Sequence, residues 1–458
     1  MKLLIYVLAL LTFSSNLIAK PDNLYLKYKD VAKKIIEEVN KNDDAWEKLA
    51  YMCDTFGPRL SGSKGHNNAL LWMESEMRKD GLENVTKEEV MVPHWVRNEE
   101  SCYLEEPHKA EFNMLGLGGS ISTGGKTIRS EVYVVKDLAE LKANYDKANG
   151  KIVVFNCEYK GYGATVQYRI HGAVWAAQAG AIASLIRSVS PVGNQNPHTG
   201  VMYYSDTIPK IPHAAITHED AAMLQRMQDR GQKPVLSLTM NCETLPDALS
   251  YNVMGELVGS SKKNEIVAIG GHSDSWDVGQ GALDDGSGCI STWKAIKLLK
   301  DLGLRAKRTI RAVMWTNEEN GTAGGKAYAK LHYDKEPHWA MFEFDSGVFP
   351  PSAIGYTGDN ELFKYYKSSE KLLKMVREEM KIKLGGGGVD IAPMMKLGVT
   401  GMSLSTESKG TLFDNHHADS DTMDKIDKQE FRDCIAAIAI AVYVYADMED
   451  IRTVDTTK

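Results

Sequence analysis

Short apolar runs in this chain alternate with longer stretches in which apolar positions recur every three or four residues. The run over 266–269 is rich in branched side chains and predicts a buried strand. The spacing of apolar residues over 287–302 predicts a helix that ends at Gly303, and another buried strand is predicted over 309–315. Strands that alternate with helices in this way indicate an α/β sheet.

A second α/β pattern lies between residues 119 and 246. A shift to Gly, Ser and Thr around 116–127 marks its start. A strand over 150–155, a helix over 167–178 and a strand over 181–186 predict a βαβ unit without a catalytic cluster, so we interpret it as a lid or as an insertion that shapes the substrate site. Its histidines lack metal-ligand spacing and are interpreted as structural or surface residues: His171, His198, His213 and His218.

The first residues are typical of a secretory signal peptide, which we expect over 1–19. One basic residue precedes an apolar run over 3–13, and small residues follow near Ala19. This run is too short to span a membrane, and no later stretch is long enough. We therefore expect a protein of the secretory pathway, secreted or lysosomal, without a membrane span. The amphipathic stretch over 23–40 predicts a helix outside the core.

Composition narrows the possible classes of protein. The chain has 458 residues, 43% of them hydrophobic and 25% charged, which suits two globular domains or one domain with an insertion. A net charge of −7 argues against a nucleic-acid partner. Six cysteines without a CxxC motif allow a disulfide in this compartment, but Cys289 and Cys434 lie in apolar helical patterns and are expected to be free. Asn84-Val-Thr is an N-glycosylation acceptor.

A histidine and several carboxylates follow the first buried strand. His272 comes directly after two glycines, and Asp274 two residues later can orient the imidazole or support its surroundings. Asp284 and Asp285 follow in a tight Asp-Asp-Gly-Ser-Gly turn. This arrangement is compatible with the beginning of a transition-metal site, and equally with an acidic surface loop.

Two further strands end in acidic residues. Glu318 and Glu319 come soon after the strand over 309–315, and Asp345 follows a predicted strand over 339–344. Each has an ordinary alternative, such as a solvated turn or a helix cap. Ligands in α/β sheets bind beyond the carboxyl ends of the strands, which is where all of these side chains fall. Their joint occurrence predicts a metal site.

Two shorter motifs do not support another chemistry. Ser61 and Lys64 match the S-x-x-K pattern of acylating serines, but no Ser-Asp-Asn partner occurs. The Gly-Gly-Lys-Thr sequence over 124–127 is similar to a phosphate loop, but Ser120 stands where that loop needs its first glycine. We interpret this stretch as a connector.

The acidic and histidine motifs resemble those of the co-catalytic zinc exopeptidases, a family that includes bacterial leucine aminopeptidases and glutamate carboxypeptidase. The motifs that carry the resemblance are His272-x-Asp274, Asp284-Asp285-x-Ser-Gly, Glu318-Glu319, Asp345 and His417-x-x-x-Asp421-Thr422. The resemblance covers nearly the whole mature chain. It implies a mixed central sheet flanked by helices over 44–118 and 247–458, a protease-associated-like insertion over 119–246, a propeptide over 20–43, and a homodimer.

The same resemblance implies two Zn²⁺ ions per subunit. Asp284 would bridge them, and the peptide bond after it would be cis. One ion would also bind His272 and Asp345, and the other Glu319 and His417. His417 stands four residues before Asp421, as the motif requires, whereas His416 does not. His417 is therefore the expected ligand of the pair. Residues expected beside the metal ligands or facing the substrate are Asp274, Asp285 and His416.

Glu318 binds no metal in this scheme and remains free as the general base. The implied activity is that of a zinc-dependent carboxypeptidase or dipeptidase acting on short peptides or dipeptides with free termini. An aminopeptidase, an aminoacylase and a non-catalytic receptor-type relative stay open as alternatives. The glycine run over 385–388 is either a flap or a linker. Asn320-Gly-Thr is a second N-glycosylation acceptor. A glycan there would crowd the turn that carries Glu318, so we expect this acceptor to be unused.

Overall fold

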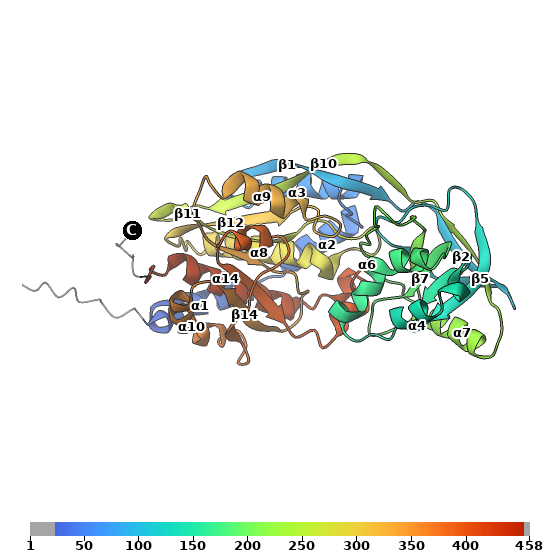
Figure 1. The fold of residues 1–458 in the computed structure, drawn as a ribbon. Coiled ribbons are helices and arrows are strands. Elements are labelled where there is room, and N and C mark those ends of the chain that lie inside the picture. Colours follow the sequence, from blue (N-terminus) through green and yellow to red (C-terminus); the bar gives the residue numbers. More distant parts are fainter. Residues whose placement is uncertain (1–22, 453–458) are drawn as a thin grey trace, which may run out of the picture.

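Two eight-stranded sheets, each with its own helices, make up the computed structural model, which describes residues 23–452 (Figure 1). The expected signal peptide over 1–19 lies outside the described residues. In spatial order, the strands of the first sheet are β1 (Glu83–Val96), β10 (Glu243–Leu257), β12 (Arg308–Trp315), β11 (Lys262–His272), β13 (His338–Glu343), β16 (Gly401–Thr406), β14 (Pro351–Thr357) and β15 (Lys381–Leu384).

The first sheet is mixed. Strands β12, β11, β13 and β16 run parallel, while β10 and β14 join them through antiparallel pairings. The parallel strands therefore end at one edge, as α/β topology requires. The α/β fold with a mixed central sheet, expected from the sequence, is confirmed.

Both faces of the central strand β11 are buried. Val267 and Ile269 belong to the larger apolar core, whereas Ile266 and Ala268 belong to a smaller one on the opposite face. The helices of the larger core include α1 (Leu24–Val39), α2 (Asp44–Phe56), α3 (Lys64–Lys79), α8 (Ser287–Asp301) and α14 (Lys428–Asp447). The smaller core is covered by α9 (Ala323–His332) and α12 (Ala392–Lys396). Burial on both faces explains why β11 is apolar without alternation.

Two glycines near the end of β11 allow close approach of the neighbouring chain. A Cβ on Gly270 would lie 1.9 Å from the carbonyl oxygen of Val313, and one on Gly271 would lie 2.2 Å from Oδ2 of Asp285. No side chain fits at either position. The glycines therefore let the Asp285 turn pack directly against the strand that presents His272.

The second sheet belongs to the inserted unit, on the right of Figure 1, where the long ribbon of β1 and β10 leads. Helix α6 (Tyr162–Gln178) connects its parallel strands β6 and β7, which confirms the predicted βαβ unit. In spatial order, its strands are β3 (Ala110–Phe112), β2 (Glu100–Glu106), β9 (Val235–Met240), β5 (Ile128–Val135), β6 (Ile152–Phe155), β7 (Ala183–Arg187), β8 (His213–Ile216) and β4 (Met114–Gly116). Because β2 to β4 precede residue 119, we propose that the insertion begins near residue 100.

Helix α1 is part of the main core, so the expectation that it lies outside the core is wrong. Leu24, Tyr28, Ala32 and Ile35 are each no more than 3% exposed. They form one stripe that packs chiefly on α14, and the Tyr28 hydroxyl donates to Oδ2 of Asp447 at 2.7 Å. The many Lys and Glu residues of this helix occupy only its outer side.

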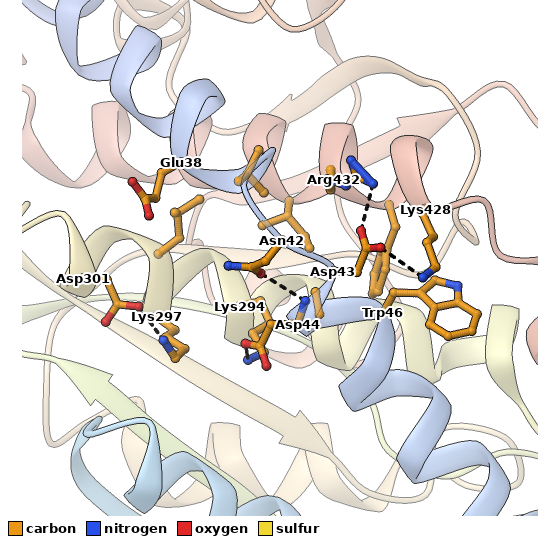
Figure 2. A pocket seen from close by; sticks show the side chains of 15 residues that line it. Glu38, Asn42, Asp43, Asp44, Trp46, Lys294, Lys297, Asp301, Lys428 and Arg432 are labelled. Atoms are coloured by element: carbon orange, nitrogen blue, oxygen red, sulfur yellow. Dashed lines mark hydrogen bonds and ion pairs between the residues drawn. The ribbon is translucent and has the colours of Figure 1, made fainter.

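The segment that follows α1 lines a hollow between this segment, α8 and α14 (Figure 2). Asp43 pairs there with Lys428 at 3.0 Å and with Arg432 at 2.8 Å, both on α14. The propeptide expected over 20–43 would therefore end in a segment that ion pairs hold to the last helix.

The described part of the chain contains no disulfide: all six cysteines are buried and free, including Cys289 and Cys434. Between residues 23 and 452, none of the helices combines the length and the apolar character needed to cross a bilayer.

Replacing Ile35 by Ala should lower the free energy of unfolding by about 2–5 kcal/mol, because it leaves a cavity in the larger apolar core. The matched control is Leu26→Ala on the same helix, where the side chain is 60% exposed and the change should stay within about 0.5 kcal/mol. Chemical denaturation measures both. Equal effects would show that α1 is not docked in solution.

Candidate metal centre

Five side chains that lie far apart in the sequence meet at the carboxyl edge of the parallel strands. His272 ends β11, and Asp345 follows β13. Glu319 lies in the loop after β12, and Asp284 lies in the turn before α8. His417 comes from the loop after α13 (Thr411–Asn415). The sheet thus gathers at one place the residues that the sequence singled out.

Asp284 lies between two groups of these residues. Its Oδ1 is 3.1 Å from Nε2 of His272, whose Nε2 is also 3.8 Å from Oδ1 of Asp345. On the other side, its Oδ2 is 3.4 Å from Nε2 of His417, and that nitrogen is 3.0 Å from Oε2 of Glu319. The peptide bond between Asp284 and Asp285 is cis, as the resemblance implied.

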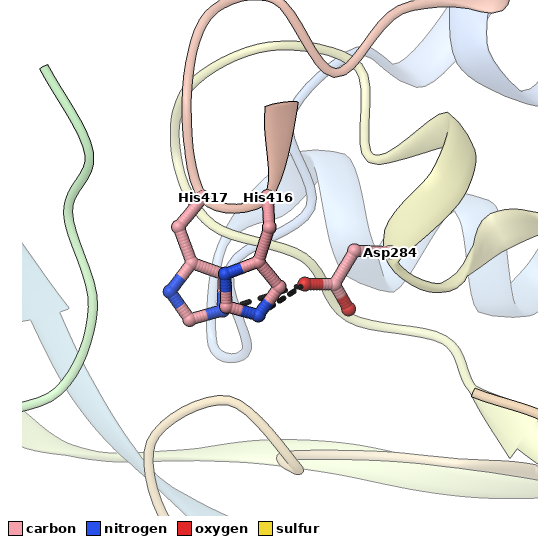
Figure 3. Close-up of side chains that lie close together, drawn as sticks. All are labelled: Asp284, His416 and His417. Atoms are coloured by element: carbon pink, nitrogen blue, oxygen red, sulfur yellow. Dashed lines mark ion pairs between the residues drawn. The ribbon is translucent and has the colours of Figure 1, made fainter. Parts of the chain in front are cut away.

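Both neighbouring histidines reach the same carboxylate (Figure 3). The rings of His416 and His417 are stacked with their centroids 3.5 Å apart, and Nε2 of His416 is 3.3 Å from Oδ2 of Asp284. His417 has a φ of 63°, in the left-handed region that non-glycine residues rarely occupy. This backbone conformation directs two consecutive side chains to one side of the loop.

Several buried polar atoms of the cluster have no hydrogen-bond partner among the described residues: His272 Nε2, Asp284 Oδ2 and Glu319 Oε1. Buried polar atoms without a partner are costly, so a group of them is typical of a ligand-binding site. One donor atom from each of these residues lies within 4.8 Å of the others. Imidazole nitrogen and carboxylate oxygen are zinc ligands, and the residues therefore fit a zinc ion.

Asp274 supports the site through the backbone. Its carbonyl oxygen is 2.9 Å from Nδ1 of His272, and its carboxylate accepts the backbone N–H groups of Glu318 at 3.1 Å and Glu319 at 3.3 Å. The carboxylate of Asp285 accepts the backbone N–H of His272 at 3.1 Å. Each acidic residue thus fixes the backbone that presents another side chain of the cluster.

Asp421 was visible in the sequence only as part of a motif, without a role. Its carboxylate accepts the backbone N–H groups of Leu283 at 2.7 Å and Asp284 at 3.1 Å. Burial raises the pKa of Asp421 to about 7, and the charge of Asp284 acts in the same direction. This residue holds the turn that carries the central carboxylate.

Arg59 is a second supporting residue that the sequence did not reveal. Its side chain is fully buried and donates to the carbonyl oxygens of Ser273 at 3.1 Å, Gln280 at 2.6 Å and Gly281 at 2.8 Å. It therefore closes the loop between His272 and the Asp284 turn. The only signal was its place in a conspicuous Gly-Pro-Arg-Leu-Ser-Gly-Ser stretch.

Glu318 lies beside the cluster and is half-buried. Burial raises the pKa of Glu318 well above its ordinary value, and although the His272 ring opposes this, the charges of Glu319 and Asp345 act with burial. A carboxylate with a raised pKa is a stronger base than an exposed one.

The remaining candidates have structural positions. Ser61 is buried and accepts from the Asn317 amide at 2.7 Å, while its own hydroxyl donates to Oδ1 of Asn320 at 2.9 Å. The side chain of Asn320 is therefore engaged and partly buried. Asn84 is exposed, and its Nδ2 donates to Oε2 of Glu256 at 2.6 Å. Among the histidines of the insertion, His198 is 2.6 Å from the carbonyl oxygen of His416 and so lies at the loop of the cluster.

Known proteins resemble this chain in sequence and in structure. Residues 252–442 match the model of peptidase family M28. The chain is 44% identical to carboxypeptidase Q of Mus musculus over 92% of its length and 90% of that protein, and 43% identical to carboxypeptidase Q of Homo sapiens over the same shares. A peptidase M28 precursor from Shewanella amazonensis has a similar structure, with a TM-score of 0.88, 32% identity, and coverage of 93% of this chain and 98% of that one. A zinc aminopeptidase from Bacillus subtilis shares the fold, with a TM-score of 0.65, 21% identity, and coverage of 89% and 98%.

The sheet, the cluster at its carboxyl edge and these similarities define a zinc-dependent exopeptidase of the M28 type. More narrowly, the chain belongs to the carboxypeptidase Q family.

Replacing Asp421 by Asn should weaken zinc binding about 10- to 100-fold, because one of the two acceptors that hold the Asp284 turn becomes a donor. Competition with a chromogenic chelator measures the affinity. The matched control is Asp424→Asn in the same loop, where the side chain is exposed and pairs with Lys425. If both variants bind zinc as the parent does, the turn does not depend on Asp421.

Proposed function

We propose that the protein is a di-zinc metallopeptidase that hydrolyses the peptide bond of dipeptides and other short peptides with free termini. The observation that carries the proposal is the convergence of the five predicted ligands around Asp284. Two zinc ions per subunit agree with the position of this carboxylate, which has one group of donor atoms on each side.

In the proposed arrangement, five side chains would hold the zinc, with Asp284 between two groups of donor atoms. His272 and Asp345 complete one group, and Glu319 and His417 complete the other. The buried donor atoms without hydrogen-bond partners support this assignment. When bound, zinc ions at such a site polarise a carbonyl group and lower the pKa of water toward about 7.

Glu318 is the proposed general base. It is the half-buried acidic residue beside the cluster that the ligand assignment leaves free, and the Asp274 carboxylate fixes its backbone N–H at 3.1 Å. It would take a proton from the attacking water and deliver it to the leaving amine. Burial raises its pKa above that of an exposed glutamate, which makes it the stronger base.

A hollow lies against Asp284, Glu319 and His417, and Trp276 and Val278 help to form its wall. A substrate can therefore reach the cluster from this side. The family name carboxypeptidase Q points to a substrate with a free carboxyl end, since a carboxypeptidase acts on such a peptide.

The test of substrate class is a panel of unmodified dipeptides, dipeptides blocked at either end, longer peptides and aminoacyl reporters. We expect cleavage of unmodified dipeptides, loss of activity with a chelator and recovery with zinc. Cleavage of amino-terminal residues from long peptides would favour an aminopeptidase instead. Cleavage of N-acylated amino acids would favour an aminoacylase.

Replacing Glu318 by Gln should lower kcat by about 10²- to 10⁴-fold and leave the zinc content unchanged, because the base is lost and the ligands remain. Its matched control is Glu319→Gln at the adjacent position, which should lose zinc. Metal analysis and dipeptide kinetics measure both effects. Near-normal turnover by the first variant would exclude Glu318 as the base, and a parent protein without zinc would favour a non-catalytic relative.

We also propose a secreted or lysosomal homodimer that is glycosylated at Asn84. The apolar leader and the exposed Asn84 acceptor support the location and the modification. Expression in a secreting cell line, followed by glycopeptide mapping and sedimentation, tests these points. A glycan on Asn320, retention in the cytosol, or sedimentation as a monomer would each contradict one of them.

A further inference from the structure

The insertion contacts the proposed ligand His417 directly. The backbone N–H of Thr199 donates to the His417 carbonyl oxygen at 2.9 Å, and the Thr199 carbonyl oxygen lies 3.2 Å from Nδ1 of the His417 ring. Thr199 lies between strands β7 and β8 of the second sheet. The ring and the backbone of this histidine are thus both held by one residue of another unit.

Arg169 of helix α6 lies against the same contact. Its Nη1 is 3.4 Å from the Thr199 carbonyl oxygen and 3.2 Å from Nδ1 of His417, and its Nη2 donates to the Tyr162 hydroxyl at 3.1 Å. The Arg169 side chain is only 4% exposed, and its Nε has no hydrogen-bond partner among the described residues. A guanidinium buried to this degree is uncommon and calls for a role.

The choice of partner for Nδ1 follows from donor and acceptor chemistry. If Nε2 of His417 is to bind a metal ion, the ring proton must be on Nδ1, and a protonated nitrogen needs an acceptor. Arg169 can only donate, whereas the Thr199 carbonyl can only accept. Thr199 is therefore the partner of the ring, and Arg169 can stabilise that carbonyl from the side.

We propose that the insertion is a working part of the zinc centre: the Thr199 carbonyl orients His417, and Arg169 is the positioning residue that holds this carbonyl in place. The inference rests on the proposed function, because it takes His417 as a zinc ligand. It assigns to the insertion a task beyond shaping the substrate site.

The surroundings of Thr199 agree with a rigid support. Its hydroxyl donates to the Gly116 carbonyl oxygen at 2.8 Å and accepts from Arg97 at 3.3 Å, and Arg97 pairs with Asp277 at 2.6 Å. Asp277 lies in the loop between His272 and the Asp284 turn, so this network connects the insertion with the main domain.

Gly200 provides an independent way to disturb the contact. A Cβ at this position would lie 2.3 Å from Cζ of Arg169, and the φ of Gly200 is +139°. An alanine there must displace the guanidinium or the backbone that follows Thr199. Gly200→Ala therefore disturbs the contact between Arg169 and Thr199 without changing the charge of Arg169.

The experiment compares zinc affinity, by chelator competition, in the full-length protein and in Arg169→Gln, Arg169→Lys and Gly200→Ala. We expect zinc binding to weaken about 10- to 100-fold in Arg169→Gln and in Gly200→Ala, with a smaller loss in Arg169→Lys. The KM for a dipeptide, measured with excess zinc, should stay near that of the parent. The double variant that combines Arg169→Gln with Gly200→Ala should bind zinc no more weakly than the single variant with the lower zinc affinity, because both changes disturb the same contact.

The matched control is Arg187→Gln in the same insertion. Arg187 also lies 3.2 Å from Nδ1 of a histidine, but that histidine is His218, which is not in the cluster. This variant should bind zinc as the parent does. A loss equal to that of Arg169→Gln would show a general effect of loosening the insertion and would overturn the inference.

His417→Ala separates this inference from the proposed function. If His417→Ala keeps full zinc affinity, the ligand assignment fails, and the inference fails with it. If His417→Ala loses zinc while Arg169→Gln and Gly200→Ala bind it like the parent, only the inference is overturned. Circular dichroism confirms folding, and if Arg169→Gln does not fold, Arg169→Lys and Gly200→Ala decide the question.

Discussion

The constraint on which the rest of this structure depends is the burial of like charges at one edge of a sheet. Asp284, Asp285 and Glu319 are all nearly removed from solvent and lie in one cluster. Carboxylates brought together in this way repel one another and lose their hydration, so they need positive charge and hydrogen-bond donors. In the arrangement proposed above, zinc supplies the positive charge. The polypeptide supplies the hydrogen-bond donors.

The donors come almost entirely from the backbone. Asp274 and Asp421 each accept two main-chain N–H groups, and Asp285 accepts from His272 and from Gly288. Arg59 works in the opposite sense and donates to main-chain carbonyl oxygens of the same loops. The loops of the centre are therefore fixed by hydrogen bonds between these side chains and main-chain groups. The atoms of the proposed ligands are not needed for this task and remain available to bind metal.

This division explains how much of the centre could be predicted from the sequence. His272, Glu319 and Asp345 could be found because they follow apolar strands, and such strands in an α/β fold end at a common edge. The α/β class was predictable for the same reason, whereas the mixed character of the sheet was implied only by the family resemblance. Arg59 and Arg169 could not be found, because their partners are mainly carbonyl groups and ring atoms brought together only by folding. The interpretation of α1 as an outer helix was wrong because charged residues occur along nearly its whole length, while its four core residues are spread over three turns.

The insertion shows a similar limit. Its sequence contains no catalytic cluster, and the sequence therefore indicated only an effect on substrate access. In the structure, Thr199 and His198 contact the backbone and the ring of the two adjacent histidines. Every residue has a backbone carbonyl oxygen, so the role of one such oxygen cannot be recognised from the residue type. A unit without catalytic side chains can thus still be essential to the geometry of a site.

The pairing of the first helix with the last has a consequence for biosynthesis. Tyr28 and Asp447, which join α1 to α14, are separated by 419 positions. A chain emerging from the ribosome therefore carries the apolar stripe of α1 without its main partner until α14 has been made. Because exposed apolar stripes promote association between incomplete chains, protection of the amino-terminal end by a chaperone would suppress such association during this interval.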